Sequence, residues 1–177
     1  MKSRMGGSTP QAWLAGLGLS PAKVNEVMNS FAPGSSPSLY LYGAGEVFVR
    51  FHGAKAASPI FLPNYWVDGS ALGQAHGRAS QFEGFLSDAE IARVAKTYYR
   101  DITAICHNWN DLKDTNLWKI TLQGGETIEG LEGPIAAQPA FYPTATQPAS
   151  ASMLSGGALQ VFLNPRTPLV CTPVDWS

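Results

Sequence analysis

The sequence predicts an α+β fold with a strongly bent, mostly antiparallel sheet. The chain of 177 residues contains 18 glycines and 13 prolines, and 11% of its residues are aromatic. This composition favours many short elements joined by turns over a helical bundle. The order of the periodic segments is the second observation: helices come first, then a hairpin, a loop, a long helix and further strands, which is typical of α+β domains.

Length and charge narrow the class of protein. The length suits one domain that buries a core without disulfides or a metal. The formal net charge of -1 and the low charged fraction of 14% argue against a nucleic-acid partner. No apolar run approaches the roughly 20 residues of a membrane span, and the polar start of the chain contains no signal peptide. We therefore expect a soluble chain.

Residues 1–38 are predicted to form an N-terminal helical segment, ahead of a main domain at 39–177. Thr9 and Ser20 are each followed by a proline, the pattern of an N-cap before a first-turn proline. We expect this helical hairpin to pad the main domain or to connect it to another part, without chemistry of its own. Its apolar residues recur at helical spacing: Trp13, Leu14 and Leu17, then Val24, Val27, Met28 and Phe31.

The chain then changes to short β-type runs. Residues 39–42 and 47–51, separated by Gly-Ala-Gly, predict a β-hairpin. Residues 61–66 predict an aromatic loop or an edge strand, because Pro63 does not fit a central strand. Residues 68–84 are small, polar and rich in glycine, and they predict a surface loop.

One long helix is predicted from residue 87 to about residue 106. Ser87 and Glu90 form a capping box, and apolar residues follow at every third or fourth position. Later elements are strands at 117–122, 127–129 and 156–163, and an edge strand near 170–174. Residues 139–155 form a loop that is long for a compact domain, and such loops are usually functional or mobile.

Two of these short runs carry polar side chains where a plain core strand would not. Arg50 and His52 are two residues apart, so they project from the same face of a strand, beside Phe48 and Phe51. Two donors beside aromatic rings suit an anionic and partly flat ligand. Gln160 follows a Gly-Gly pair and is surrounded by apolar residues, so its strand would bury one amide.

Each candidate also has a structural interpretation. Arg50 is either a clamp on a pyrophosphate, which its planar guanidinium suits, or a surface arginine at a strand end. His52 is either a donor to a ribose or an imidazole bonded to a backbone carbonyl. Gln160 and, with less support, Gln138 are either ligand contacts or structural amides. The aromatic residues at 61–66 are either core residues or a stack for a ligand ring.

Common metal and nucleotide motifs are absent from the sequence. The three histidines do not fall at ligand spacing, and there is no paired-cysteine motif. There is also no phosphate-binding Gly-Lys-Ser loop, no dinucleotide-binding glycine motif and no Gly-x-Ser-x-Gly turn. We therefore predict no metal site and disfavour metalloenzymes and serine hydrolases.

Several motifs occur together in an order that resembles one enzyme superfamily. They are Arg50 followed by His52-Gly53, Phe61-Leu62-Pro63, Asn108-Trp109-Asn110, Gly133-Pro134-Ile135-Ala136-Ala137-Gln138, and Gly156-Gly157 three residues before Gln160. Over about residues 39–165 this succession resembles the toxin domains of the ADP-ribosyltransferase superfamily, which end bacterial polymorphic and type VI secretion effectors. It is most similar to the NAD-glycohydrolase branch that includes the tuberculosis necrotizing toxin. The resemblance implies an ADP-ribosyltransferase-like split β-sandwich.

The resemblance also implies roles for individual residues. Arg50 would bind the pyrophosphate of NAD(P)+, Gln160 would bind the ribose next to nicotinamide, and His52 would join them as a third catalytic residue. Trp66 or Phe61 would lie against the nicotinamide ring. The remaining expected contacts to NAD(P)+ are Phe51, Gly53, Gln138 and Gly157. NAD(P)+ is then a substrate, and no further cofactor is expected.

Further expectations about biology depend on this resemblance. They are a toxin that depletes NAD, export by a specialised secretion system without a signal peptide, action in the target-cell cytoplasm, a carrier protein and a cognate immunity protein. Two alternatives stay open. His52-Gly53 also resembles the diphtheria-toxin and poly-ADP-ribose polymerase branch, so the chain could be a transferase, although Gln160 stands where that branch has a glutamate. The chain could also be a non-catalytic binding or secretion-adaptor domain.

Overall fold

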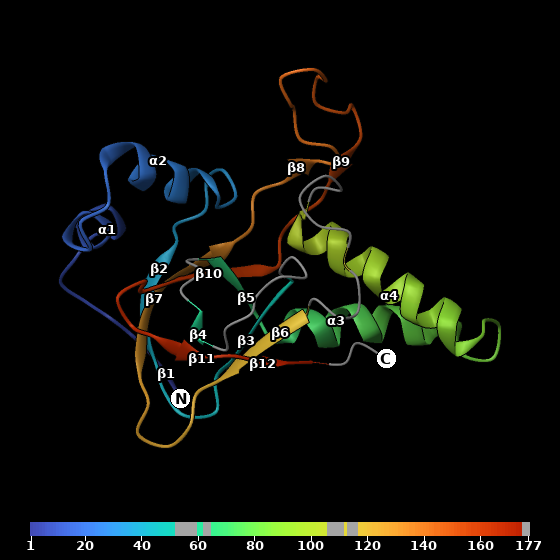
Figure 1. Cartoon of the computed structure of the whole chain (residues 1–177), viewed down its shortest axis with the longest axis horizontal. Helices are drawn as coiled ribbons and strands as arrows, with labels where there is room; N and C mark the ends of the chain where they lie inside the picture. The colour runs from blue at the N-terminus through green and yellow to red at the C-terminus, as the bar shows by residue number, and fades with distance from the viewer. Residues whose placement is uncertain (52–59, 62–64, 106–111, 113–116, 175–177) are drawn as a thin grey trace.

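A computed structural model describes residues 1–51, 60–61, 65–105, 112 and 117–174, with only the backbone at 60–61 (Figure 1). This part of the chain is mixed α+β, with four α-helices and a mostly antiparallel sheet. The helices are α1 (Pro10–Gly16), α2 (Pro21–Asn29), α3 (Ser70–Ala79) and α4 (Asp88–Thr103). The strands are β1 (Lys2–Arg4), β2 (Ser38–Tyr42), β3 (Val47–Phe51), β4 (Ile60–Phe61), β5 (Tyr65–Asp68), β6 (Leu117–Thr121), β7 (Ile128–Pro134), β8 (Gln138–Pro139), β9 (Met153–Leu154), β10 (Leu159–Leu163), β11 (Leu169–Val170) and β12 (Thr172–Pro173).

The main sheet has the strand order β1-β2-β7-β10-β5-β3-β6-β12, and its neighbouring strands are antiparallel. The strands predicted around Gln160 and at 117–122 are confirmed as β10 and β6. β10 lies between β7 and β5, near the middle of the sheet. The amide that the sequence predicted to be buried is therefore carried by a central strand.

The predicted hairpin between residues 39–42 and 47–51 is wrong. Both runs are strands, but β2 pairs with β1 and β7, while β3 pairs with β5 and β6. The turn between them bonds to the end of β6, with Gly45 N donating to Leu122 O at 2.9 Å and Leu122 N to Glu46 O at 3.0 Å. The turn thus carries the chain across the sheet, and each of the two strands pairs with other antiparallel strands instead.

Two further predictions are wrong, one for residues 65–66 and one for the loop at 68–84, whereas Phe61 lies in the short strand β4, which pairs with β11 in a separate two-stranded sheet. Tyr65–Asp68 forms the central strand β5, since Pro63 precedes the strand and does not interrupt its ladder. The predicted surface loop at 68–84 contains helix α3, which is followed by a short 3-10 turn. Its buried residues Ala71, Ala75 and Ala79 form a stripe at intervals of four. A stripe of small residues lets α3 pack closely on α4, but it gives little hydrophobic contrast in the sequence.

The long helix is confirmed as α4, with the predicted capping box of Ser87 and Glu90. Glu90 Oε2 accepts from the backbone N–H of Ser87 at 2.9 Å. The helix ends earlier than predicted, because Ala104 adopts a left-handed conformation with φ of 49°. Two local signals, a cap and a regular apolar spacing, were sufficient to predict this element.

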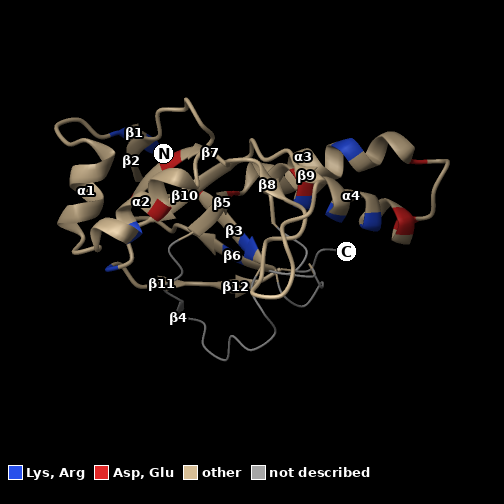
Figure 2. Ribbon diagram, turned by 90° about the horizontal axis from the view of Figure 1, so that it is seen from above, with Lys and Arg blue, Asp and Glu red and all other residues tan. Residues whose placement is uncertain are grey.

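The two helix pairs cover the same face of the sheet at opposite ends (Figure 2). Leu14 and Val27 of α1 and α2 pack with Phe162 of β10, whereas Tyr99 and the alanines of α3 pack with Phe51 of β3. Strand register places Phe162 and Phe51 on one face, through the pairing of β10 with β5 and of β5 with β3. A third core cluster, which includes Trp66, lies on the other face.

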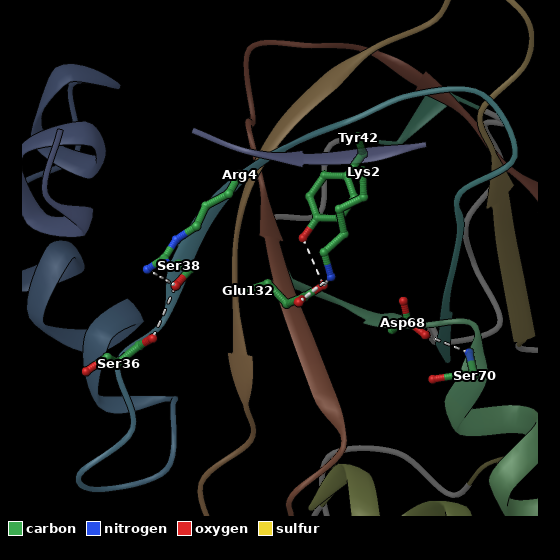
Figure 3. A network of polar contacts seen from close by, with 8 residues as sticks. All are labelled: Lys2, Arg4, Ser36, Ser38, Tyr42, Asp68, Ser70 and Glu132. Carbon is green, nitrogen blue, oxygen red and sulfur yellow. Dashed lines mark hydrogen bonds and ion pairs between the residues drawn. The ribbon is translucent and has the colours of Figure 1, made fainter. Parts of the chain in front are cut away.

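Residues near the start of the chain belong to the sheet, which the sequence did not predict. β1 pairs with β2, and Lys2 Nζ contacts both carboxylate oxygens of Glu132 in β7, at 2.5 and 2.7 Å (Figure 3). The Tyr42 hydroxyl donates to Glu132 Oε2 at 3.1 Å. Burial is the main cause that raises the pKa of Tyr42, which keeps its hydroxyl protonated as a donor. The segment 1–38 thus shares both sheet and core with the rest of the chain.

Candidate functional site

A cleft of about 810 Å³ lies between the two helix pairs. Its walls come from the carboxyl-terminal ends of α2 and α4, and its floor comes from β10, β5 and β3. The side chains around it are those of Glu26, Asn29, Ser30, Arg50, Phe51, Tyr65, Trp66, Val67, Tyr99, Thr103, Ala104, Ile105, Ile135, Gln138, Tyr142 and Gln160. Five residues that the sequence predicted to bind NAD(P)+ are in this set: Arg50, Phe51, Trp66, Gln138 and Gln160.

Gln160 lies on the floor of the cleft and is 9% exposed. Its Nε2 donates to Ser30 Oγ at 2.6 Å, and Ser30 Oγ donates to the carbonyl oxygen of Val27 at 2.7 Å. The register of β10 with β5 places Gln160 opposite Val67 on the face that the helices cover. A buried amide at this point is held by the last turn of α2, which is 130 residues away in the sequence.

Arg50 reaches the cleft from the other face of the sheet. Strand alternation puts its side chain on the face opposite to Phe51 and Gln160. Its Nη1 donates to the carbonyl oxygen of Tyr65 at 3.1 Å, at the start of β5. Burial lowers the pKa of Arg50 below its ordinary value. A guanidinium partly removed from water interacts strongly with an anionic group that reaches it.

The α2 wall contributes polar groups that sequence reasoning missed. Glu26, Asn29 and Ser30 line the cleft, although the N-terminal segment was expected to have no chemistry. Glu26 Oε1 accepts from Lys23 Nζ at 2.6 Å and from the Tyr65 hydroxyl at 3.2 Å. The sequence signal that could have identified these residues is their spacing. Residues 26, 29 and 30 share one face of α2, beside its apolar stripe.

The α4 wall is mainly apolar. Tyr99 is fully buried and its ring meets that of Phe51 edge to face, with centroids 5.3 Å apart. Thr103 Oγ1 donates to the carbonyl oxygen of Tyr99 at 2.6 Å, so the hydroxyl is directed back along the helix. The left-handed residue Ala104 ends α4 at the cleft. This wall is therefore built from aromatic and aliphatic side chains, and of these Ile105 is partly exposed.

The cleft presents charge of both signs. Among the described residues that line it, Arg50 is the one cation and Glu26 the one anion. The carboxyl-terminal ends of α2 and α4 also face it, since their C-caps Ser30 and Ala104 are in its lining. Helix carboxyl-terminal ends carry partial negative charge, which favours a cationic group nearby. The arrangement suits a ligand that is anionic in one part and cationic in another.

The chain matches no known protein-family model, no curated protein and no solved structure.

Trp66, which was expected to stack against a ligand ring, contributes almost no exposed surface. It is 1% exposed and packs in the core cluster on the far face of the sheet with Phe48 and Val161. The reason is alternation along β5, because Tyr65 and Val67 face the cleft side and Trp66 between them does not. The rings in the cleft lining with more exposed surface are those of Tyr65 and Tyr142.

Of the other residues that were expected to contact NAD(P)+, one lines the cleft, one lies in a turn outside it and the rest lie wholly or in part outside the described residues. Gln138 in β8 lines the cleft, but Gly157 does not, and its N–H donates to the carbonyl oxygen of Ile135 at 3.0 Å. The φ of 91° at Gly157 is a conformation that favours glycine, so its role here is in the turn before β10. His52, Gly53 and the side chain of Phe61 lie outside the described residues.

Two further properties concern the part of the chain that the structure describes. No group of three or more His, Cys, Asp or Glu side chains there is arranged to hold a metal ion. No helix there combines the length and the apolar character needed to cross a membrane.

Alkaline pH is expected to destabilise the protein through tyrosines that are buried or partly buried. Burial is the main cause that raises the pKa of Tyr42, Tyr65 and Tyr99 above the ordinary value of 10. These groups stabilise the fold fully below about pH 10, where both states are protonated, and the contribution is lost above it as the unfolded chain ionises. We expect the melting temperature to fall between about pH 9 and pH 11.

Tyrosinate absorbance in the ultraviolet provides the control for this prediction. Ionisation of Tyr42, Tyr65 and Tyr99 should coincide with the loss of circular dichroism and not precede it. Tyr99→Phe should reduce the pH dependence, because it removes one titrating group. Full ionisation of all six tyrosines in a protein that is still folded would contradict the prediction.

Proposed function

We propose that this chain is an NAD(P)+ glycohydrolase, a toxin domain that hydrolyses NAD(P)+ to nicotinamide and ADP-ribose. The observation that carries the proposal is that Arg50 and Gln160, about a hundred residues apart in the sequence, line one cleft. These are the two residues to which the resemblance gives the pyrophosphate and the ribose. NAD(P)+ also combines an anionic pyrophosphate with a cationic nicotinamide ring, which suits a cleft that is lined by Arg50, Glu26 and the carboxyl-terminal ends of α2 and α4.

In the proposed reaction the bond between ribose C1′ and the nicotinamide nitrogen breaks. Its electron pair goes to the nitrogen, so nicotinamide leaves as a neutral molecule and needs little acid catalysis. Water forms the new bond to C1′ and releases its proton to solvent. The protein mainly has to hold the dinucleotide and stabilise an oxocarbenium-like sugar. Arg50 would hold the pyrophosphate, and Gln160 would hold the ribose hydroxyls.

Incubation of the purified chain with NAD(P)+ and no protein acceptor tests this proposal. We expect nicotinamide and free ADP-ribose to appear together and in equal amounts. Release of nicotinamide without ADP-ribose, together with label transfer from NAD to a protein or nucleotide in a lysate, would make the chain an ADP-ribosyltransferase. No release and no transfer would leave a non-catalytic binding or adaptor domain and would overturn the proposal.

The proposed activity has a biological setting that follows from the same resemblance. A glycohydrolase of this kind would be exported by a specialised system on a carrier protein and would act on NAD(P)+ in the target-cell cytoplasm. Producing cells would need a cognate immunity protein. Expression of the chain in a cell provides the readout. The wild-type chain alone should lower the cellular NAD content, and an inactive Gln160 variant should not.

A further inference from the structure

The amide of Gln160 is held from one side only. Nε2 donates to Ser30 Oγ at 2.6 Å, and no described residue provides a hydrogen-bond partner for Oε1. Gln160 is at the cleft surface although it is mostly buried. One polar atom of this amide is thus satisfied by the protein, and the other is available to a molecule in the cleft.

The identity of these two atoms follows from the chemistry of Ser30 and Val27. A carbonyl oxygen only accepts, so the contact of 2.7 Å between Ser30 Oγ and Val27 O requires the hydroxyl proton of Ser30. The hydroxyl has no second proton, so it presents a lone pair to Gln160. A carbonyl oxygen of the amide would meet that lone pair unfavourably, whereas the NH2 group donates to it. The NH2 group therefore faces Ser30, and Oε1 is left for the cleft.

Ser30 is itself held firmly by backbone bonds. Its carbonyl oxygen accepts from Ala136 N at 2.9 Å, and its N–H donates to Glu26 O at 3.1 Å. The next residue, Phe31, forms a bridge with Ile135. The end of α2 is thus fixed to the segment that follows β7, directly beside β10. A hydroxyl on this support sets the orientation of the amide for as long as the fold persists.

We propose that Ser30 is a positioning residue that fixes Gln160 as a hydrogen-bond acceptor toward the ligand. The cleft would then recognise a donor at this point, such as a sugar hydroxyl, and an anion at Arg50. These two requirements set the direction in which a dinucleotide lies, with a ribose at Gln160 and phosphate oxygens at Arg50. The identity of the ligand rests on the proposed function, whereas the orientation of the amide rests on the three contacting groups alone.

A double-mutant cycle tests the positioning role. With Gln160 present, Ser30→Ala frees the amide to turn, and kcat for NAD cleavage should fall about tenfold, the upper range for one neutral hydrogen bond, with KM little changed. With Gln160→Glu the two carboxylate oxygens both accept, so orientation no longer matters and Ser30→Ala should add no further loss. An equal loss in both backgrounds would mean that Ser30 has only a structural role and would overturn the inference.

Ser30→Thr is the matched control, because it keeps the hydroxyl and should keep most of the wild-type kcat. Melting temperatures of the variants separate a change in orientation from a change in folding. If Ser30→Ala unfolds, the nuclear magnetic resonance measurement below still tests the orientation of the amide, because it uses the wild-type chain.

A second measurement does not depend on turnover. In nuclear magnetic resonance spectra of the wild-type chain, the side-chain NH2 protons of Gln160 should show cross-relaxation with the β protons of Ser30. Absence of these cross-peaks would overturn the assigned orientation even in an active enzyme. Their presence in a protein that releases no nicotinamide would support the orientation and sink the proposed function, so the two failures are distinguishable.

Discussion

Gln160→Ala is expected to lower the rate of nicotinamide release about 100-fold or more, with a smaller effect on KM. The amide lies on the floor of the cleft and is fixed by Ser30, so it is in place before the ligand arrives. Removal of a preorganised hydrogen bond that strengthens in the transition state typically costs this much. Steady-state kinetics with NAD(P)+, with nicotinamide and ADP-ribose both quantified, provide the measurement.

The matched control is Gln74→Ala, which makes the same change on the exposed face of α3. This variant should have the kinetics of the wild type. Both variants should retain a cooperative melting transition, because Gln160 faces the cleft and does not belong to a core cluster. Normal turnover in Gln160→Ala would remove Gln160 from the mechanism and with it the main support for the proposed activity.

Arg50→Ala is expected to lower kcat/KM by about 100-fold, mainly through KM. Its guanidinium lies at the start of β5 and is partly removed from water, so an anion that it binds would form a strong, charge-assisted pair. Truncation of one partner of such a pair typically costs about 2–5 kcal/mol. Arg50→Lys keeps the charge but loses the planar fork that matches phosphate oxygens, so its loss should be intermediate.

Arg93→Ala removes an exposed arginine of α4 and serves as the control for net charge. It should leave kcat/KM unchanged at ordinary ionic strength. Inorganic pyrophosphate should inhibit the wild type competitively and inhibit Arg50→Ala much less. Equal inhibition of both proteins would show that the anionic part of the ligand lies elsewhere.

The elements that sequence predicted well have signals within a few residues. The capping box of Ser87 and Glu90 with its apolar repeat predicted α4, and the Gly-Gly pair before an apolar run predicted β10. Strand partners were not predictable in this way. The sequences of β2 and β3 have the pattern of a hairpin. Only the competition between strands distant in the sequence decides that β2 pairs with β7 and β3 with β6.

The difference between local signals and distant contacts also explains why only part of the candidate site was predicted. Arg50 and Gln160 were singled out because a polar residue in an apolar run is a local signal. Glu26 and Ser30 were missed because their place in the cleft depends on how α2 docks on the sheet, across about 130 residues. The burial of Trp66 was not predictable because the start of β5 sets which face each residue takes, and a shift of one residue exchanges the faces.

The place of β10 in the sheet has a consequence for biosynthesis. A nascent chain that ends before residue 159 lacks the strand between β7 and β5, so β1-β2-β7 and β5-β3-β6 have no hydrogen-bonded ladder that joins them. Such a chain also lacks Gln160 and the part of the cleft floor that β10 forms. Translation up to this strand yields no competent site, so the proposed activity can begin only after residues 159–163 have been made.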